Sequence, residues 1–418
     1  MPNPAPARST RWSDDAFLDT LRQSADVSAD KCVAALNSKD DFARLFARAA
    51  VNNVKIPDDA PQALRDFYSE TDLLILLESD RVKFPDGLDH ARLRRGERIF
   101  LDHAFAFCLV LLAKSLPEGY AAPNLAVLLN MSGNLRSRPY RRLLGVLQLV
   151  VDVSSIGGFD TGGRAVAAAR QARLMHAGIR RIVPRVLPDY STKYDGAPVN
   201  LEDMLGTIMG LSLLVIDGVP KLYDSLSEDD AEDYYYLWRA FAVAMGIHPP
   251  NEHGTSFWVP ANISEAREFY VSYERRHYAH DPAQNVDGVA LARENLVMMQ
   301  ALIPKRLNAF GFGRLPLIFM KQLIGTDGCR RVGLIPANAK AESHPLLMFA
   351  LGAILRFFHR LDRLDPTGRF HPTLARLLLQ NMIKRQYGGD VTFRIPESLK
   401  QVQQLLDRDV PVETSPDR

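Results

Sequence analysis

The residues best suited to chemistry lie in one predicted helix, residues 162–180 (GGRAVAAARQARLMHAGIR). One face of this helix is mainly alanine and glycine, and it carries a single imidazole, His176, flanked at helical spacing by Arg173 and Arg180. Histidine is a common metal ligand, and the planar guanidinium of arginine suits a carboxylate. Two interpretations are open. The helix either packs closely on a neighbour around a core histidine, or it leaves room for a flat cofactor such as haem, with iron on His176 and propionates near the arginines.

A second candidate metal site is Glu274-x-x-His277-x-x-His280, which is followed by Asp281. Glu-x-x-His is half of a di-iron carboxylate motif, and such sites use two copies. The sequence holds no second copy. A polar helix end is therefore the favoured interpretation.

Three other patterns are weaker. His248, Glu252 and His253 occupy a proline-rich loop without a nearby cysteine or fourth ligand, which disfavours a zinc site. Gly-x-Ser-x-Gly is absent, and Ser212 is interpreted as a serine that bonds back to its own helix. The glycine cluster 157–163 lacks the GxGxxG spacing of a dinucleotide site; it predicts a flexible hinge or a backbone that approaches a ligand.

Arg142 and Thr207 are polar residues in predicted apolar helices. A buried guanidinium requires an anionic partner, because an unpaired one is strongly destabilising. Asp152, or a bound carboxylate or propionate, would supply that partner, whereas an exposed helix start would need none. Thr207 is either a hydrogen-bonding residue of the core or a donor that lines a pocket.

Helical periodicity dominates the chain and strand signals are scarce, so we expect an all-α fold. Ser13 and Ser28 are predicted N-caps of short N-terminal helices. Asn200 is the predicted N-cap of a central apolar helix, with Asp203 at the capping-box position. A loop is expected over residues 184–198. Further helices are expected over residues 39–51, 94–115, 138–151, 264–276, 289–308, 344–361 and 372–385.

The 418-residue chain is 47% hydrophobic and 24% charged, as in an ordinary folded protein. Its net charge of +2, without a basic run, predicts no nucleic-acid partner. Three widely spaced cysteines without a CxxC pair predict reduced thiols. The N-terminus lacks an apolar signal segment, and no uninterrupted apolar stretch reaches the roughly 20 residues that span a bilayer. We therefore expect a cytoplasmic protein with no stable membrane span.

The order of several segments resembles the latex clearing protein and MpaB-type oxygenase family, over residues 95–325 or so. Its pieces are LPEGYAAPNLAVLLNMSG, PYRRLLGVLQLVVDV, RQARLMHAGIRR, APVNLEDMLGTIMGLS, WRAFAVAMGI, PANISEAREFY and ALIPKRLNAFGFGRLP. The resemblance implies an all-α fold with a globin-like core, b-type haem, and oxidation or cleavage of isoprenoid substrates with O₂. Three parts are then expected: N-terminal wrapping helices over 1–89, the haem-binding core over 90–330, and C-terminal helices packed on it over 331–418.

The resemblance also implies roles for single residues. It places the family's proximal haem histidine on His176 and its recurrent arginine of the preceding helix on Arg142. The QED-like helix start falls on the Leu-Glu-Asp of residues 201–203, and the threonine of the following turn falls on Thr207.

Two departures concern the distal side of the haem. Rubber-cleaving members of the family have a Lys-Thr pair where this chain has Gly145 and Val146. They also use a carboxylate base in a helix that corresponds to residues 123–132, where this chain has no acidic residue. These differences argue against rubber cleavage itself more than against haem binding.

The sequence and the resemblance together predict an oxygenase that carries haem b, with the iron on His176, and acts with O₂ on a hydrophobic small molecule, in some cases an isoprenoid. Arg142, Arg173 and Arg180 are predicted to pair with the propionates or to anchor the His176 helix, and Arg142 and Thr207 are the catalytic candidates. Two alternatives stay open: a haem protein without oxygenase activity, such as a sensor or a peroxidase-like protein, and a cofactor-free helical scaffold. The oligomeric state is left undetermined.

Overall fold

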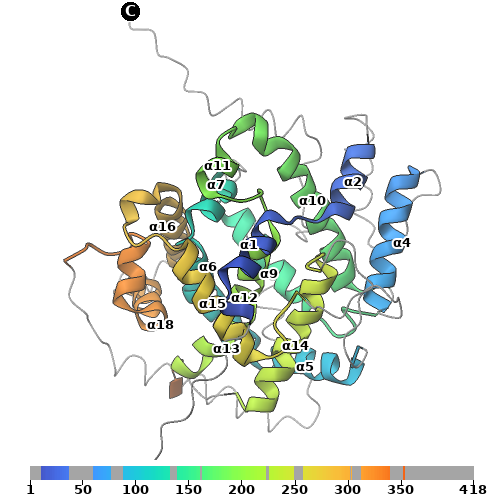
Figure 1. Ribbon diagram of the computed structural model, residues 1–418. Coiled ribbons are helices and arrows are strands. Elements are labelled where there is room, and N and C mark those ends of the chain that lie inside the picture. Colours follow the sequence, from blue (N-terminus) through green and yellow to red (C-terminus); the bar gives the residue numbers. More distant parts are fainter. Residues whose placement is uncertain are drawn as a thin grey trace, which may run out of the picture.

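The computed structural model describes residues 11–36, 60–76, 88–131, 139–160, 162–222, 226–248, 258–301, 303, 312–338 and 352–353. Every regular element within these ranges is a helix (Figure 1). The α-helices are α1 (Asp15–Gln23), α2 (Val27–Ala35), α4 (Gln62–Leu76), α5 (His90–Val110), α6 (Leu116–Gly119), α7 (Pro123–Met131), α9 (Pro139–Val153), α10 (Arg164–Val186), α11 (Tyr190–Tyr194), α12 (Leu201–Leu211), α13 (Leu213–Gly218), α14 (Glu228–Ala244), α15 (Ile263–His277), α16 (Val286–Ala301) and α18 (Leu315–Arg331). The all-α prediction is confirmed for this part of the chain.

The centre of the fold is the pair α5 and α14, which lie side by side (Figure 1). From Ala231 onward nearly every residue of α14 is buried, as expected for a helix that is apolar on most sides. The two helices approach closely at Gly96 of α5, where a Cβ atom would stand 2.6 Å from the carbonyl oxygen of Asp233. The rings of Phe107 and Tyr234 then meet edge to face, with centroids 4.7 Å apart.

The central helix α12 begins where the sequence predicts, but it ends at Leu211, and α13 begins at Leu213, where the apolar sequence predicts one continuous helix. The Asn200 side chain accepts a hydrogen bond from the backbone N–H of Asp203 at 2.8 Å, which is the expected N-cap geometry. At the other end Ser212 Oγ donates to the carbonyl oxygen of Ile208 at 2.7 Å, so the prediction of a back-bonded serine is confirmed. Of the residues of α12, Thr207 and Gly210 alone are not buried.

The His176 helix, α10, is longer than predicted. It runs to Val186, because Pro184 lies in its last turn and forfeits a single backbone hydrogen bond before the helix ends. The predicted loop over residues 184–198 contains the short helix α11. Both α2 and α4 lie against α10 (Figure 1), and their apolar residues form a satellite core with Leu174 and Ala177.

The two serine N-caps predicted near the N-terminus are wrong. Asp14 caps α1 by accepting from the N–H of Ala16 at 3.0 Å, and Asp26 caps α2 by accepting from Ala29 at 3.1 Å. Ser28 lies instead in the first turn of α2, where its hydroxyl donates to Glu70. The carboxylate of Asp26 has a second partner far along the chain, described below, which fixes its position.

The glycine cluster before α10 is a close-packed turn, and the predicted hinge or backbone facing a ligand stays a prediction. A Cβ atom on Gly163 would stand 2.2 Å from the carbonyl oxygen of Gly158. Gly157 and Gly162 have φ of 76° and 75°, a region that L side chains rarely adopt. These glycines let the turn fold back on itself, and residue 161 lies outside the described ranges.

Several predicted elements lie outside the described residues: the helices over 39–51 and 372–385, and that over 344–361 apart from residues 352–353. Two segments, His90–Gly119 and Leu201–Lys221, are long and apolar enough to cross a membrane, with mean hydropathy of 1.8 and 1.4. However, 67% and 78% of these apolar windows are buried inside the fold. Such burial is typical of a core helix, so their length and composition alone are weak signals of a membrane span.

Candidate functional site

His176 lies near the middle of α10 with a partly buried side chain. Its Nδ1 atom is buried, and no hydrogen-bond partner for it exists within the described residues. Desolvation by burial, with a smaller effect from the charge of Arg180, lowers the pKa of His176 from its ordinary 6.5 to about 4, against the opposing effect of Asp26. At neutral pH the imidazole is therefore uncharged, which is the form that binds a metal.

The two arginines that flank His176 are both engaged by carboxylates of the N-terminal segment. Arg173 is fully buried and holds Asp26 through two hydrogen bonds, Nε to Oδ2 at 2.6 Å and Nη2 to Oδ1 at 2.8 Å. Arg180 donates from Nε to the two carboxylate oxygens of Asp30 at 2.8 and 3.1 Å. The sequence left two roles open for these arginines, pairing with haem propionates and anchoring the His176 helix. This geometry corresponds to anchoring.

The helix that carries Arg142, α9, packs against α10. The Arg142 side chain lies outside the described part of the structure. Asp152, its candidate partner in the sequence, accepts from Gln148 at 2.9 Å and lies 3.6 Å from Arg164 Nη1. The Asp152 carboxylate therefore already interacts with Gln148 and Arg164.

On the same helix, Gly145 is buried and Val146 is half-buried, and Val146 packs on the main core. Neither side chain can donate a hydrogen bond. This part of α9 therefore offers an apolar surface, where rubber-cleaving relatives are expected to have a Lys-Thr pair.

Thr207 lies on the least buried face of α12. Its Oγ1 donates to the carbonyl oxygen of Asp203 at 3.0 Å, and its side chain is exposed. Gly210, one turn further on, also has open space beside it, since a Cβ atom there would meet no atom within 4 Å. No hydrogen bond within the described residues joins Thr207 to His176.

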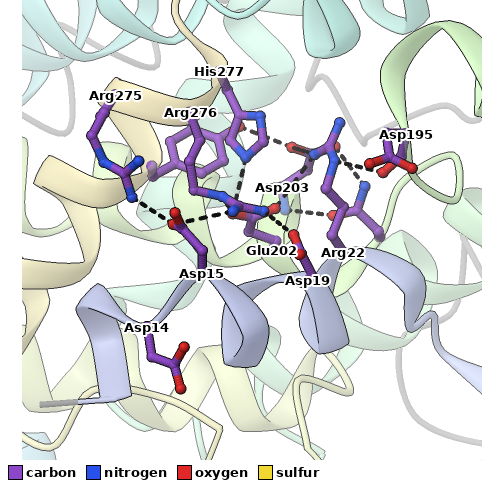
Figure 2. Close-up of polar contacts among 12 residues, drawn as sticks. Asp14, Asp15, Asp19, Arg22, Asp195, Glu202, Asp203, Arg275, Arg276 and His277 are labelled. Carbon is purple, nitrogen blue, oxygen red and sulfur yellow. Dashed lines mark hydrogen bonds and ion pairs between the residues drawn. The ribbon is translucent and has the colours of Figure 1, made fainter.

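A buried cluster of charges lies where α12 begins, and no sequence pattern predicted it. Glu202 and Asp203 are 0% and 1% exposed. Figure 2 shows their side chains meeting Arg22 of α1 together with Arg276 and His277 of α15. Glu202 Oε1 lies 2.9 Å from both Arg276 Nε and His277 Nε2, and its other oxygen lies 3.4 Å from Arg22 Nη1.

Asp203 completes the cluster. It accepts hydrogen bonds from Asn124 and Asn200, and from the Tyr273 hydroxyl at 3.1 Å. Burial, and then the charge of Asp203, raise the pKa of Tyr273 well above its ordinary value. The two carboxylates already have partners on every oxygen, so the cluster holds helices together and leaves no free base. A helix start at residues 201–203 is readable from the sequence, whereas the partners that bury it come from distant helices.

The alternative metal sites find little support. Glu274 pairs with Arg331, and His277 faces Glu202. No group of three or more His, Cys, Asp or Glu side chains within the described ranges is arranged to hold a metal ion. Glu252 and His253 fall outside those ranges.

One pocket of about 570 Å³ is lined mainly by apolar residues of α16 and of residues 333–337, with Arg293 as its cation. It includes neither His176 nor Thr207. None of the residues predicted from the sequence to form a site lines it, and we assign it no role.

Comparisons with known proteins now place this geometry in context. The family model described as "ER-bound oxygenase mpaB/B'/Rubber oxygenase, catalytic domain" matches residues 97–394. The rubber oxygenase of Streptomyces sp. (strain K30) is 22% identical over 248 residues, which are 57% of this chain and 56% of that protein. The chain therefore spans about half the length of this curated relative.

A solved structure, that of latex clearing protein in the closed state, has a TM-score of 0.63 and 19% identity, and covers 86% of this chain and 89% of that chain. This similarity shows a common helical fold. Because the family model matches well over half of its residues, the chain belongs to the family of mpaB/B' and rubber oxygenase catalytic domains.

Proposed function

We propose that this protein is a haem-dependent oxygenase that uses O₂ on a hydrophobic, isoprenoid-type substrate. His176 would bind the iron of haem b. The observation that carries the proposal is the partly buried imidazole with its buried Nδ1 atom. It stands at the position that the family resemblance gives to the proximal histidine, and its Nδ1 has no hydrogen-bond partner within the described residues.

The residues around His176 are compatible with such a group. A buried polar atom without a partner costs about 1–3 kcal/mol, and a metal bound at Nδ1 would offset part of that cost. The lowered pKa keeps the ring neutral and able to coordinate. The small residues Ala172 and Ala169, one and two turns before it on the same face, leave the helix surface flat.

When bound, haem supplies the redox chemistry with O₂, and the protein controls ligation and access. His176 would hold the iron. Arg173 and Arg180 are committed to Asp26 and Asp30, so we assign them to the support of α10, and Arg142 remains the candidate for a propionate. Val146 would help to keep the site apolar, as a hydrophobic substrate requires.

A visible absorption spectrum of the purified full-length chain, expressed with ample haem precursor, tests the proposal. We expect a Soret band that His176→Ala abolishes. The matched control is His280→Ala, since His280 is an exposed histidine on another segment. A colourless wild-type protein, or equal haem content in both variants, would contradict the assignment.

Gly145 and Val146 favour a second candidate function, a haem protein without oxygenase activity, because neither supplies a donor for bound oxygen. Measuring O₂ consumption with and without terpenoid substrates separates the two. Substrate-dependent consumption supports the oxygenase, whereas a Soret band with no substrate-dependent consumption supports the second candidate.

A further inference from the structure

Three charged residues at intervals of four, Arg22, Asp26 and Asp30, connect the N-terminal segment to the helices of the candidate site. This segment precedes residue 97, where the match to the catalytic-domain family begins. Its side chains nevertheless reach α10 and α12, the two helices that carry His176 and Thr207.

The strongest of these connections is the pair Asp26 and Arg173. The Arg173 side chain is 0% exposed, and that of Asp26 is 2% exposed. Burial raises the pKa of Asp26, but the charge and hydrogen bonds of Arg173, helped by the N–H of Ala29, outweigh it and leave that pKa below its ordinary value. Gly246 packs against both groups, and a Cβ atom there would stand 3.0 Å from the Asp26 carboxylate. The pair is therefore enclosed as well as bonded.

The second connection is the pair Asp30 and Arg180. The Arg180 guanidinium also donates to the carbonyl oxygens of Val199 at 3.2 Å and of Asp26 at 3.4 Å. The Asp30 side chain is 38% exposed, and burial raises its pKa more than Arg180 lowers it. This pair is accordingly the weaker of the two.

These contacts bracket His176. Arg173 precedes it by three residues and Arg180 follows it by four, so both stand on the same side of α10, one turn before and one turn after the imidazole. Two ion pairs to a single partner segment, on either side of one residue, fix both the rotation of the helix about its axis and its position along that axis.

Arg22 extends the connection to α12. Its guanidinium donates to the carbonyl oxygen of Tyr194 and lies 3.4 Å from Glu202 and 3.5 Å from Asp203. One turn later Thr207 bonds to the carbonyl of that same Asp203. The N-terminal segment thus contacts α12 from the end of α1, and α10 from the start of α2.

We propose that Asp26 and Asp30 are positioning residues that set the orientation of His176. The N-terminal segment that carries them is then required for the geometry of the candidate site. The expected fall in haem affinity on losing these carboxylates rests on the proposed function above. The expected loosening of α10, seen as faster hydrogen exchange, does not rest on it.

The test compares Asp26→Asn and Asp30→Asn with a matched control, Asp233→Asn. Asp233 is also a buried carboxylate, 7% exposed, with two arginine partners, but it joins α5 to α14 instead of α10. Hydrogen exchange in the cofactor-free full-length chain should quicken over residues 170–182 in the two test variants. In the control, that stretch should exchange at the wild-type rate.

Haem titration and the iron–histidine stretching frequency provide the second readout. We expect affinity to fall about tenfold in Asp26→Asn and about threefold in Asp30→Asn, with a shifted stretch in both. Asp30→Glu, which keeps the ion pair, should restore the wild-type frequency, and Asp233→Asn should never lose it.

Unchanged exchange over α10 in the folded test variants would overturn the inference, and so would an equal change in Asp233→Asn. If Asp26→Asn does not fold, Asp30→Asn decides, because its carboxylate is partly exposed. A wild-type protein that takes up no haem would refute the proposed function, while the exchange comparison would still decide whether these carboxylates position His176.

Discussion

Asn124 at the start of α7 donates from Nδ2 to both carboxylate oxygens of Asp203, at 2.8 and 2.7 Å. Asp203 is almost wholly buried, and hydrogen bonding of this kind is what makes a buried carboxylate tolerable. Through this one residue the beginnings of α7 and α12 are joined, and Tyr273 adds α15 to the junction.

Replacing Asp203 with Asn should therefore destabilise the protein by about 3 kcal/mol. The change removes the negative charge beside Arg22, and it replaces one accepting oxygen with an NH2 group that would face the donors now bound to Asp203. The control is Asp327→Asn, whose carboxylate is 90% exposed and pairs with Arg330 on the surface. That change should stay within about 0.5 kcal/mol. Urea unfolding of both variants provides the comparison, and equal losses would show that the junction contributes little.

Two glycines of α12 should respond in opposite directions to alanine. A Cβ atom on Gly206 would stand 2.6 Å from the Tyr273 ring, so Gly206→Ala should cost about 1–3 kcal/mol by overpacking. Gly210 has no atom within 4 Å of that position, so Gly210→Ala should stabilise the cofactor-free protein by about 0.5–1 kcal/mol through higher helix propensity. Thermal or denaturant unfolding measures both, and a loss of stability in Gly210→Ala would contradict the open space seen beside it.

The buried imidazole predicts a pH dependence of stability in the cofactor-free protein. The pKa of His176 is about 4 in the folded chain and near the ordinary 6.5 when unfolded. Well above pH 6.5 the imidazole is neutral in both the folded and the unfolded state, so it does not affect stability. As the pH falls below 6.5, the imidazole is protonated in the unfolded state but stays neutral in the folded state. The free energy of unfolding therefore falls until about pH 4. At pH 5 the loss from this residue should be about 2 kcal/mol relative to pH 7.5.

His176→Leu removes this titration and serves as the reference, because every other group titrates alike in both proteins. The wild type should therefore lose about 2 kcal/mol more than the variant between pH 7.5 and pH 5. Parallel stability curves would mean that the imidazole is more accessible to water than the structure has it.

Cys32, Cys108 and Cys329 are all buried, and burial raises the pKa of each thiol to about 12. The thiolate is the reactive form, so none should react with a thiol reagent in the native protein at pH 8. All three should react in denaturant. Rapid labelling of a native cysteine would show that its part of the fold opens readily.

Much of this molecule was predictable because it depends on local rules. Apolar residues at helical spacing predict the all-α class, and a side chain that caps or bonds back within one turn is readable at Asn200 and Ser212. The order of short segments was enough to indicate the family. The solitary imidazole among alanines makes His176 a candidate ligand, and that role stays a prediction.

Only the tertiary structure decided the partners. The sequence left Arg173 and Arg180 open between a cofactor and the protein, and both are held by carboxylates about 150 positions earlier in the chain. Asp26, the partner of Arg173, is also the residue that caps α2, where the sequence predicts Ser28. Helix propensity acts over a few residues, whereas the charge and burial of a side chain depend on which distant groups the packed helices bring beside it.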